Sequence, residues 1–430
     1  MRATKDSGIE WIGQIPQEWD VRKIKHCFNV YAGATPKSGN SEFWDGDIVW
    51  VTPADYTTEQ KYVNDGRKNI TSEGFESCST EMIPAGSLIF SKRAPIGLVA
   101  INTVDLCTNQ GCLSCVPLDK NDVEYFYYAF SCFTEQFDLY GSGTTFKEIS
   151  ADAFVNFPIP YPGPETQRGI SEYLRSRCSE IDPLIAAKEK TNALLKERRQ
   201  SIIYEAVTKG LNPDAPMKDS GIEWIGEIPE NWGIAALKRV ATPSTGMTPS
   251  KTNSLYWEGD IPWFSSKDIK ADYLFDSEDH ISQQAVDECG LTVHDENSVV
   301  FCARSGILRH TFPVAVLKCK GTINQDLRVL ATSAAIDPEF LMYYLRGMNN
   351  TIVTLYQKVG ATVESIEMEW LLYLPVALPP VEVQKQIAEY IVARCNEIDG
   401  QIAANEVSVQ KLKEYRQSVI YEAVTGKIEI

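Results

Sequence analysis

The sequence contains no long apolar run and no recognisable secretion signal. No stretch approaches the roughly 18 to 20 consecutive apolar residues that a membrane-spanning helix needs. The first residues, MRATKDSGIEWIG, lack the apolar segment of a signal peptide. We therefore expect a cytoplasmic protein with no membrane partner. The 11 cysteines are odd in number and scattered along the chain, which favours reduced thiols over a disulfide framework.

The motifs of common enzyme classes are also missing. There is no G-x-x-x-x-G-K-[ST] phosphate loop, no H-E-x-x-H zinc motif and no G-x-S-x-G nucleophile turn. There is neither a glycine-rich cofactor loop nor the Asn/Asp-Pro-Pro-aromatic run of amino-methyltransferases. The chain has only four histidines. These absences predict a chain that is not itself an enzyme and binds no cofactor.

Two local patterns resemble chemical sites but have simpler interpretations. Cys112 and Cys115 have the spacing of half a zinc site, but no second Cys or His pair accompanies them, so we interpret them as structural and expect no metal. Asp45 and Asp47 flank Gly46 between tryptophans. That arrangement is typical of a turn that leads into a strand, with Asp capping the turn, more than of an acid/base pair.

Acidic residues outnumber basic ones, giving a formal net charge of −17. The excess lies in residues 1–164 and 210–381, whereas residues 165–209 are slightly basic. Such a charge opposes binding to nucleic acid, which normally needs a basic surface. Any DNA contact must therefore use local groups of Lys and Arg, and we expect the chain alone to bind DNA weakly.

The strongest signal in the sequence is an internal duplication. The segment DSGIEWIGQIP at 6–16 recurs with one substitution at 219–229, and WDGDIVW at 44–50 recurs as WEGDIPW at 257–263. The Asn-Gln pair at 109–110 recurs at 324–325, and Tyr-Glu-Ala-Val-Thr at 204–208 recurs at 421–425. The shift between the copies changes only slightly along the chain, so the two halves share one order of elements and differ in loop lengths.

Each half is predicted to contain a leader, a globular body of α and β elements, and a long helix. In the bodies, 87–90 and 297–301 are typical of strands, and 123–133 and 338–346 of short amphipathic helices. The fold class is thus α+β, with two pseudo-symmetric mixed α/β domains. The expected division is residues 1–164 (leader 1–20), helix 165–209, residues 210–381 (leader 210–232) and helix 382–427.

Each of the two long segments carries a narrow apolar stripe, at steps of three, four or seven residues in the more regular second one, which is typical of coiled coils. About 43 residues at about 1.5 Å each make a rod of roughly 60 Å, and we expect the two rods to pair antiparallel as a spacer. Pro183 and Gly400 can interrupt the rods only locally. The alternative is that they are core helices of separate domains. The stripe residues are Ile170, Leu174, Ile181, Ile185, Leu195, Ile202, Ile387, Ile391, Ile398, Ile402, Val409, Leu412 and Val419.

Together these repeated features resemble one family, the specificity subunit of type I restriction-modification systems. The leader, the Trp-acid-Gly-Asp-Ile segment, the Asn-Gln pair and the Glu-x-Gln opening of each helix at 165–167 and 382–384 carry the resemblance, which covers essentially the whole chain. It implies two target recognition domains that read the two halves of a bipartite double-stranded DNA target. It also implies two methyltransferase subunits, which carry S-adenosylmethionine, and restriction subunits that translocate DNA, as partners.

The candidate DNA contacts are polar residues of loops, because Arg and Lys suit guanine, and Asn and Gln suit adenine. The turns at 33–36 and 246–249 are expected to contact phosphates more than bases. Asn109 and Asn324, being shared by both halves, suit a loop brace as well as base reading. The candidates are Thr35, Lys37, Lys92, Arg93, Asn109, Gln110, Thr144, Thr145, Lys147, Thr248, Ser250, Lys251, Ser266, Lys267, Arg304, Arg309, Asn324, Gln325 and Thr362.

Two other functions stay open from the sequence. One is a self-sufficient endonuclease with a hidden acidic site, and the other is an acidic protein-binding scaffold or DNA mimic. The sequence favours a monomeric, non-catalytic DNA-recognition subunit because the leader and the long helix are both duplicated.

Overall fold

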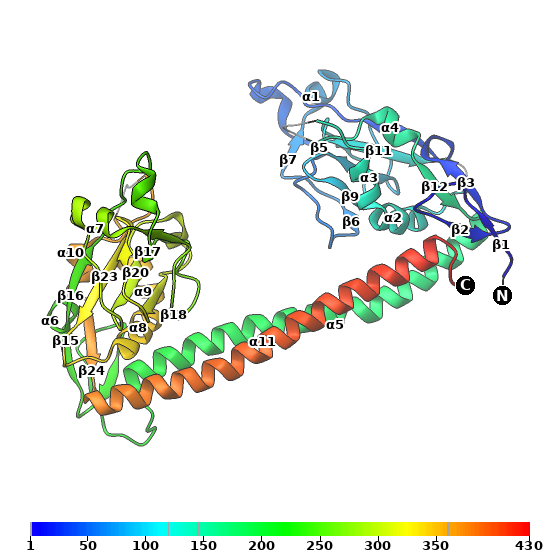
Figure 1. Cartoon of the computed structure of the whole chain (residues 1–430). Coiled ribbons are helices and arrows are strands. Elements are labelled where there is room, and N and C mark those ends of the chain that lie inside the picture. The colour runs from blue at the N-terminus through cyan, green and yellow to red at the C-terminus, as the bar shows by residue number, and fades with distance from the viewer. Residues whose placement is uncertain (1, 119, 144–146, 359–361) are drawn as a thin grey trace. The chain divides into compact units, whose positions relative to one another are not determined.

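The computed structural model describes residues 2–118, 120–143, 147–358 and 362–430. The chain forms two compact units, Met1–Lys188 with Val407–Ile430 and Glu189–Glu406. Each unit therefore joins one globular body to part of both long helices, α5 (Pro164–Lys209) and α11 (Val381–Val424). Figure 1 labels the elements along the chain.

The first body is a mixed α and β domain. Its main sheet has the strand order β4-β11-β8-β9-β6, beside a sheet β10-β5-β7 and the pairs β12-β3 and β1-β2. The strands are β1 (Thr4–Asp6), β2 (Gln14–Pro16), β3 (Asp20–Lys23), β4 (Phe28–Ala32), β5 (Trp44–Val51), β6 (Tyr62–Val63), β7 (Lys68–Ile70), β8 (Leu88–Lys92), β9 (Ile96–Asn102), β10 (Cys107–Thr108), β11 (Cys112–Pro117) and β12 (Pro158–Tyr161). The helices are η1 (Ile24–His26), η2 (Ser41–Phe43), α1 (Ser72–Glu76), α2 (Val123–Cys132), α3 (Thr134–Leu139) and α4 (Ala151–Val155).

The second body repeats this order strand for strand. Its sheets are β16-β23-β20-β21-β18, β19-β17-β22, β15-β24 and β13-β14. The strands are β13 (Met217–Asp219), β14 (Glu227–Pro229), β15 (Gly233–Ala236), β16 (Ala241–Thr245), β17 (Ile261–Phe264), β18 (Tyr273–Leu274), β19 (Asp279–Ile281), β20 (Val299–Cys302), β21 (Val314–Leu317), β22 (Thr322–Ile323), β23 (Leu327–Thr332) and β24 (Pro375–Leu378). The helices are α6 (Leu237–Val240), η3 (Ser254–Trp257), α7 (Gln283–Cys289), η4 (Gly306–Arg309), α8 (Pro338–Gly347), α9 (Asn349–Leu355) and α10 (Met368–Leu371). The sequence duplication is thus a duplication of fold.

The strands and helices expected in the bodies are present. The segments at 87–90 and 297–301 contribute β8 and β20, and the two expected helices are α2 and α8. Asp122 and Asp337 cap these helices, each accepting a hydrogen bond from a main-chain N–H of the first turn.

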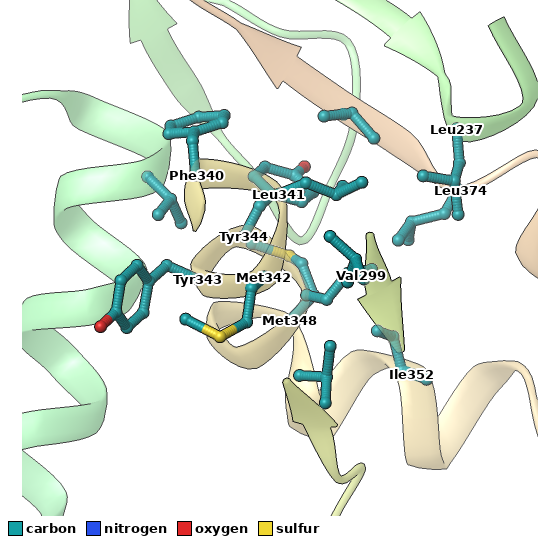
Figure 2. Packing of buried hydrophobic residues seen from close by; sticks show 14 of the residues in the cluster. Leu237, Val299, Phe340, Leu341, Met342, Tyr343, Tyr344, Met348, Ile352 and Leu374 are labelled. Carbon is teal, nitrogen blue, oxygen red and sulfur yellow. The ribbon is translucent and has the colours of Figure 1, made fainter. Parts of the chain in front are cut away.

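α2 and α8 differ from the expected amphipathic pattern because they are buried nearly all round. Six consecutive residues are buried in each, Tyr125–Phe130 in α2 and Phe340–Leu345 in α8. Figure 2 shows α8 with Tyr343 on the side away from Val299 and Leu374. The Tyr344 hydroxyl donates to the carbonyl oxygen of Pro375 at 2.7 Å, which satisfies its polar end. Apolar surface on all sides of a short helix therefore anchors each body.

The long helices begin where the sequence predicts, and α5 continues through Pro183 without a break. In the first unit, Ile181 and Ile185 pack against Val409 and Leu412. In the second unit, the Asn405 side chain donates to that of Asn192 at 3.0 Å. The two helices therefore pair antiparallel in both units, and the alternative of core helices in separate domains is wrong.

The ends of the apolar stripe belong to the bodies instead of to the helix pair. Ile170, Leu174 and Val419 lie in the core of the first body, and Ile387 and Ile391 in the core of the second. Ile398 and Ile402 are buried, whereas Leu195 and Ile202 are only half-buried. The stripe thus contributes to the cores of the bodies as well as to the contact between the helices.

Two interhelical ion pairs repeat the symmetry of the sequence. Arg416 Nε lies 2.7 Å from Asp182 Oδ1 in the first unit, and Arg199 Nε lies 3.1 Å from Asp399 Oδ1 in the second. Arg416 and Asp399 occupy the places of Arg199 and Asp182 in the repeat, with the same shift that relates the two Tyr-Glu-Ala-Val-Thr segments. The paired helices are therefore related by the same internal repeat as the bodies.

The repeated leader is held by the repeated helix end. The Tyr421 hydroxyl donates to the carbonyl oxygen of Trp11 at 3.2 Å, and the Tyr204 hydroxyl donates to that of Trp224 at 2.6 Å. Each leader therefore contacts the carboxyl end of the helix that comes from the other half of the sequence. This contact explains why Tyr-Glu-Ala-Val-Thr and the leader are duplicated together.

The Trp-acid-Gly-Asp-Ile segments are places of close main-chain approach. A Cβ on Gly46 would lie 2.5 Å from the carbonyl oxygen of Ile70, and one on Gly259 would lie 2.3 Å from that of Ile281. In the first body the segment is a bulged start of β5, and in the second it is a bend before β17. A glycine is required here because any side chain would collide with the neighbouring strand.

No helix among the described residues has both the length and the apolar stretch required to cross a membrane. The eleven cysteines are free thiols, as expected for a reduced protein. Burial raises the pKa of Cys27, Cys107 and Cys112 to about 12.

These thiols predict a pattern of alkylation by iodoacetamide at pH 8. A pKa of about 12 lowers the thiolate fraction about a thousandfold relative to an ordinary cysteine, so Cys27, Cys107 and Cys112 should react far more slowly in the folded than in the urea-unfolded chain. The half-buried Cys78 and Cys289 should react first, as followed by peptide mass spectrometry. Equal rates at Cys78 and Cys112 in the folded chain would contradict the predicted burial.

A second prediction concerns Gln384, which is fully buried at the start of α11. Its amide oxygen accepts from the Asp337 N–H at 2.7 Å, and its nitrogen donates to the carbonyl oxygens of Pro379 and Ala335 at 2.8 and 3.0 Å. Gln384→Ala should lower the free energy of unfolding by about 2 kcal/mol or more, because buried polar groups lose their partners. Urea unfolding followed by tryptophan fluorescence measures the change.

The matched control is Gln283→Ala, which removes an exposed glutamine that bonds only within α7 in the same unit, to Asp287 at 2.8 Å. That variant should stay within about 0.5 kcal/mol of the parent chain. Equal losses for both variants would show that Gln384 does not brace α11 against the second body.

Candidate nucleic-acid interface

In the first body, the strand ends bring most of the predicted DNA contacts together. Ala32 at the end of β4 pairs with Leu113, and Ser91 near the end of β8 pairs with Cys112 at the start of β11. The Lys92 N–H donates to the carbonyl oxygen of Gly111 at 2.9 Å. The loops that follow β4 and β8 and precede β11 therefore meet at one edge of the sheet. We call residues 33–37, 92–95, 108–111, 142–143 and 147–149 the first loop cluster.

The second body forms the equivalent second loop cluster, residues 246–251, 303–309, 324–326 and 362–366. The N–H groups of Ala303 and Arg304 both donate to the carbonyl oxygen of Asp326, at 2.8 and 3.1 Å. The Ser305 N–H donates to the carbonyl oxygen of Glu364 at 3.0 Å. Segments that lie far apart in the sequence thus form one surface in each body.

The shared turns at 33–36 and 246–249 lie against the Asn-Gln loops. A Cβ on Gly33 would lie 2.2 Å from the carbonyl oxygen of Thr108, and one on Gly246 would lie 1.8 Å from that of Ile323. The following threonines then donate to the glutamines, Thr35 to Gln110 and Thr248 to Gln325, the latter at 2.6 Å. These Thr-Gln pairs are partly exposed and occupy equivalent places in the two clusters.

Asn109 and Asn324 brace their loops, which was one of their two expected roles. The Asn109 side-chain oxygen accepts from the Gly111 N–H at 2.8 Å. The Asn324 oxygen accepts from the N–H groups of Asp326 and Leu327 at 3.0 and 3.1 Å, and the residue is buried. The turn hydrogen bonds use the acceptor of each asparagine side chain.

Many of the predicted cations are already ion-paired. Lys92 Nζ lies 2.8 Å and Arg93 Nη1 lies 3.3 Å from the Glu148 carboxylate. Arg309 pairs with Glu364. Lys147 pairs with Asp138, and Lys267 pairs with Glu278 and Asp279. Carboxylates of the same body therefore offset part or all of the positive charge of these groups.

Other candidates are exposed and form no ion pair with the described residues. Lys37 follows the first shared turn, Lys251 follows the second, and Arg304 follows β20. Ser250 and Thr362 are also exposed, while Ser266 is half-buried. Thr144 and Thr145 lie outside the described residues.

The sequence interpretation missed apolar residues in the second loop cluster. Met247 and Ile307 are 51% and 45% exposed, although apolar side chains of this size are normally buried. Apolar groups on a DNA-reading surface can contact the methyl group of thymine. Met247 takes the place of Ala34 in the repeat, and that difference was the only available signal.

Arg328 was also missed because it lies inside a strand pattern. Its guanidinium donates to the carbonyl oxygens of Gln325 and Leu327, both at 2.7 Å, and burial lowers its pKa. It therefore supports the loop that presents Gln325.

The acidic residues near Gly46 and Gly259 show no arrangement suited to metal chemistry. Within the described ranges, no group of three or more His, Cys, Asp or Glu side chains is placed to hold a metal ion. Cys112 and Cys115 are fully buried in β11.

Similar proteins were found both in sequence and in structure. Residues 16–195 and 229–404 match the family model of the type I restriction modification DNA specificity domain. The chain is 29% identical over 427 residues to the type I restriction enzyme MjaIX specificity subunit of Methanocaldococcus jannaschii, covering 97% of this chain and 95% of that one. It is 27% identical over 279 residues to the EcoR124I/EcoR124II specificity subunit of Escherichia coli, covering 64% and 63%.

The fold is similar to that of a solved chain described under "Structural basis underlying complex assembly and conformational transition of the type I R-M system". The TM-score is 0.73 at 16% sequence identity, with 96% of this chain and 99% of that chain covered. The family match covers most of both halves, including both loop clusters' strands. The chain therefore belongs to the type I restriction modification DNA specificity family, and it carries that family's domain twice.

Proposed function

We propose that this chain reads a bipartite double-stranded DNA target, with one half-site contacted by each loop cluster. The observation that carries this proposal is that one scaffold is present twice with different loop residues. The Thr-Gln pairs are shared, whereas Lys92 is replaced by Ala303 and Ala34 by Met247. A shared scaffold with different loop residues suits two related domains that read different bases.

The paired helices are proposed to set the distance between the half-sites and to present binding surfaces for partner subunits. The rise per residue of an α-helix is fixed by its main-chain hydrogen bonds, so a helical spacer fixes length far better than a loop does. Half-sites about one DNA turn apart, near roughly 34 to 36 Å, are within the reach of such a spacer.

The partners are proposed to be two methyltransferase subunits, with S-adenosylmethionine bound there, and restriction subunits that translocate DNA. This chain contributes recognition and no catalytic group. Support comes from Lys92, Arg93 and Arg309, because cations that are already ion-paired attract phosphates less, and partner subunits would supply the remaining attraction.

The test is to co-express the chain with its methyltransferase partner and to map methylated adenines across a genome. We expect one motif with two specific parts separated by a fixed number of unspecified base pairs. Random or absent methylation would overturn the proposal, as would DNA cleavage by the purified chain with Mg²⁺ alone.

Arg304 gives a sharper prediction because it is exposed and ion-paired to none of the described residues. Arg304→Ala should reduce methylation of the full motif about tenfold to a hundredfold, because one lost base contact costs about 1 to 3 kcal/mol. It should relax one position in one half-site and leave the other half-site unchanged. Motif mapping with the variant measures both effects.

Arg2→Ala is the matched control, since Arg2 lies in the first leader and pairs with Glu18 there. It removes the same charge away from both loop clusters. If Arg304→Ala weakened all sequences equally, Arg304 would be a phosphate contact instead of a base contact.

A further inference from the structure

One glutamate in each loop cluster is held against the candidate DNA-reading cations. In the first cluster, the main chain of Glu148 forms two hydrogen bonds with Ser142, at 2.9 and 3.0 Å. The next N–H, that of Ile149, donates to the carbonyl oxygen of Lys92 at 3.0 Å. This ladder places the carboxylate beside β8, where it accepts from Lys92 Nζ at 2.8 Å and from Arg93 at 3.3 Å.

In the second cluster, Glu364 is likewise held beside a candidate cation, Arg309. The carbonyl oxygen of Glu364 accepts from the Ser305 N–H, and the Ile366 N–H donates to the carbonyl oxygen of Ala303 at 2.8 Å. Its carboxylate accepts from the Arg309 guanidinium. In the first body, the main chain of Arg93 pairs with that of Glu148. In the second body, the main chain of Arg304 pairs with that of Ser365, so the ion-paired glutamate, Glu364, lies one residue before the equivalent position.

Both glutamates are charged at neutral pH. Hydrogen bonding from Lys92 lowers the pKa of Glu148, and hydrogen bonding from Arg309 lowers the pKa of Glu364. The side chains of Glu148 and Glu364 are 32% and 20% exposed, whereas that of Arg309 is 67% exposed. Each cluster therefore holds a carboxylate against some of its cations, while Lys37, Lys251 and Arg304 form no ion pair with the described residues.

These ion pairs reduce the electrostatic free energy that is released when DNA binds. A phosphate that displaces the glutamate replaces one anion by another, so the attraction common to all DNA is largely cancelled. A matching base edge adds hydrogen bonds that a phosphate does not make, and those bonds still favour the matching sequence.

Resting on the proposed function, we propose that Glu148 and Glu364 are specificity-determining residues, which suppress binding to unrelated DNA by competing with it for Lys92, Arg93 and Arg309. A purely structural brace predicts the opposite effect, because loss of a brace weakens binding to every sequence.

The test uses Glu148→Gln and Glu364→Gln in the full chain, each assembled with its methyltransferase partner. The DNA duplexes carry the mapped motif, a one-base mismatch in either half-site, or an unrelated sequence. Fluorescence anisotropy at several salt concentrations gives the affinity and its salt dependence, and methylation of the mismatched duplexes gives the specificity.

We expect each variant to bind unrelated DNA about threefold to tenfold more tightly, with a salt slope steeper by about one counterion. Glu148→Gln should increase methylation of mismatches in the first body's half-site only, and Glu364→Gln in the second body's only. Glu148→Asp, which keeps the charge, should retain the discrimination of the parent chain.

The matched controls are Glu18→Gln and Asp295→Asn, which remove the same charge from ion pairs with Arg2 and Lys320 in the bodies, outside both loop clusters. They should leave the ratio of motif to unrelated affinity unchanged. Unchanged ratios in the Glu148 and Glu364 variants, or weaker binding to all duplexes, would overturn this inference alone. A parent complex that methylates no bipartite motif would overturn the proposed function and this inference with it.

Discussion

The structure depends on the burial of a narrow apolar stripe that neither long helix can bury alone. Ile181 and Ile185 of α5 need Val409 and Leu412 of α11, and the stripe then continues at Leu174 into the core of a body. Because the helices are antiparallel, each body receives the start of one helix and the end of the other. The Tyr421 and Tyr204 hydroxyls complete this arrangement by tying each leader to the helix from the other half.

The repeat also explains why short motifs survive in an otherwise divergent pair of domains. Gln167 and Gln384 are fully buried, and each accepts from the main chain of the residue that caps α2 or α8. A buried amide group is costly without partners, so the residue at this place is restricted to one that satisfies the same donors and acceptors. The surface loops carry no such restriction and can differ between the bodies.

Charge and specificity are connected in the loop clusters. The net charge of −17 at first argues against a DNA-binding protein. The structure shows that some of these carboxylates lie beside the candidate cations and form ion pairs with them. Ion-paired cations attract phosphate less than unpaired ones do. The side chains of Gln110, Gln325 and Arg304 are exposed in the loop clusters, and we propose that sequence discrimination arises there.

The sequence by itself determined the duplication, the mixed α and β class, the long helices and the family resemblance, because repeats and apolar spacing are local properties of the chain. It also identified polar residues that converge at one edge of each body. Only the tertiary structure decided which of these residues are exposed and which are ion-paired. The sequence does not indicate that Glu148 lies on Lys92, since the two are far apart along the chain, and it leaves two roles open for Asn324, of which the structure shows the loop brace. Ion pairs and buried hydrogen bonds depend on distances across the fold, and those distances exist only once the strands have paired.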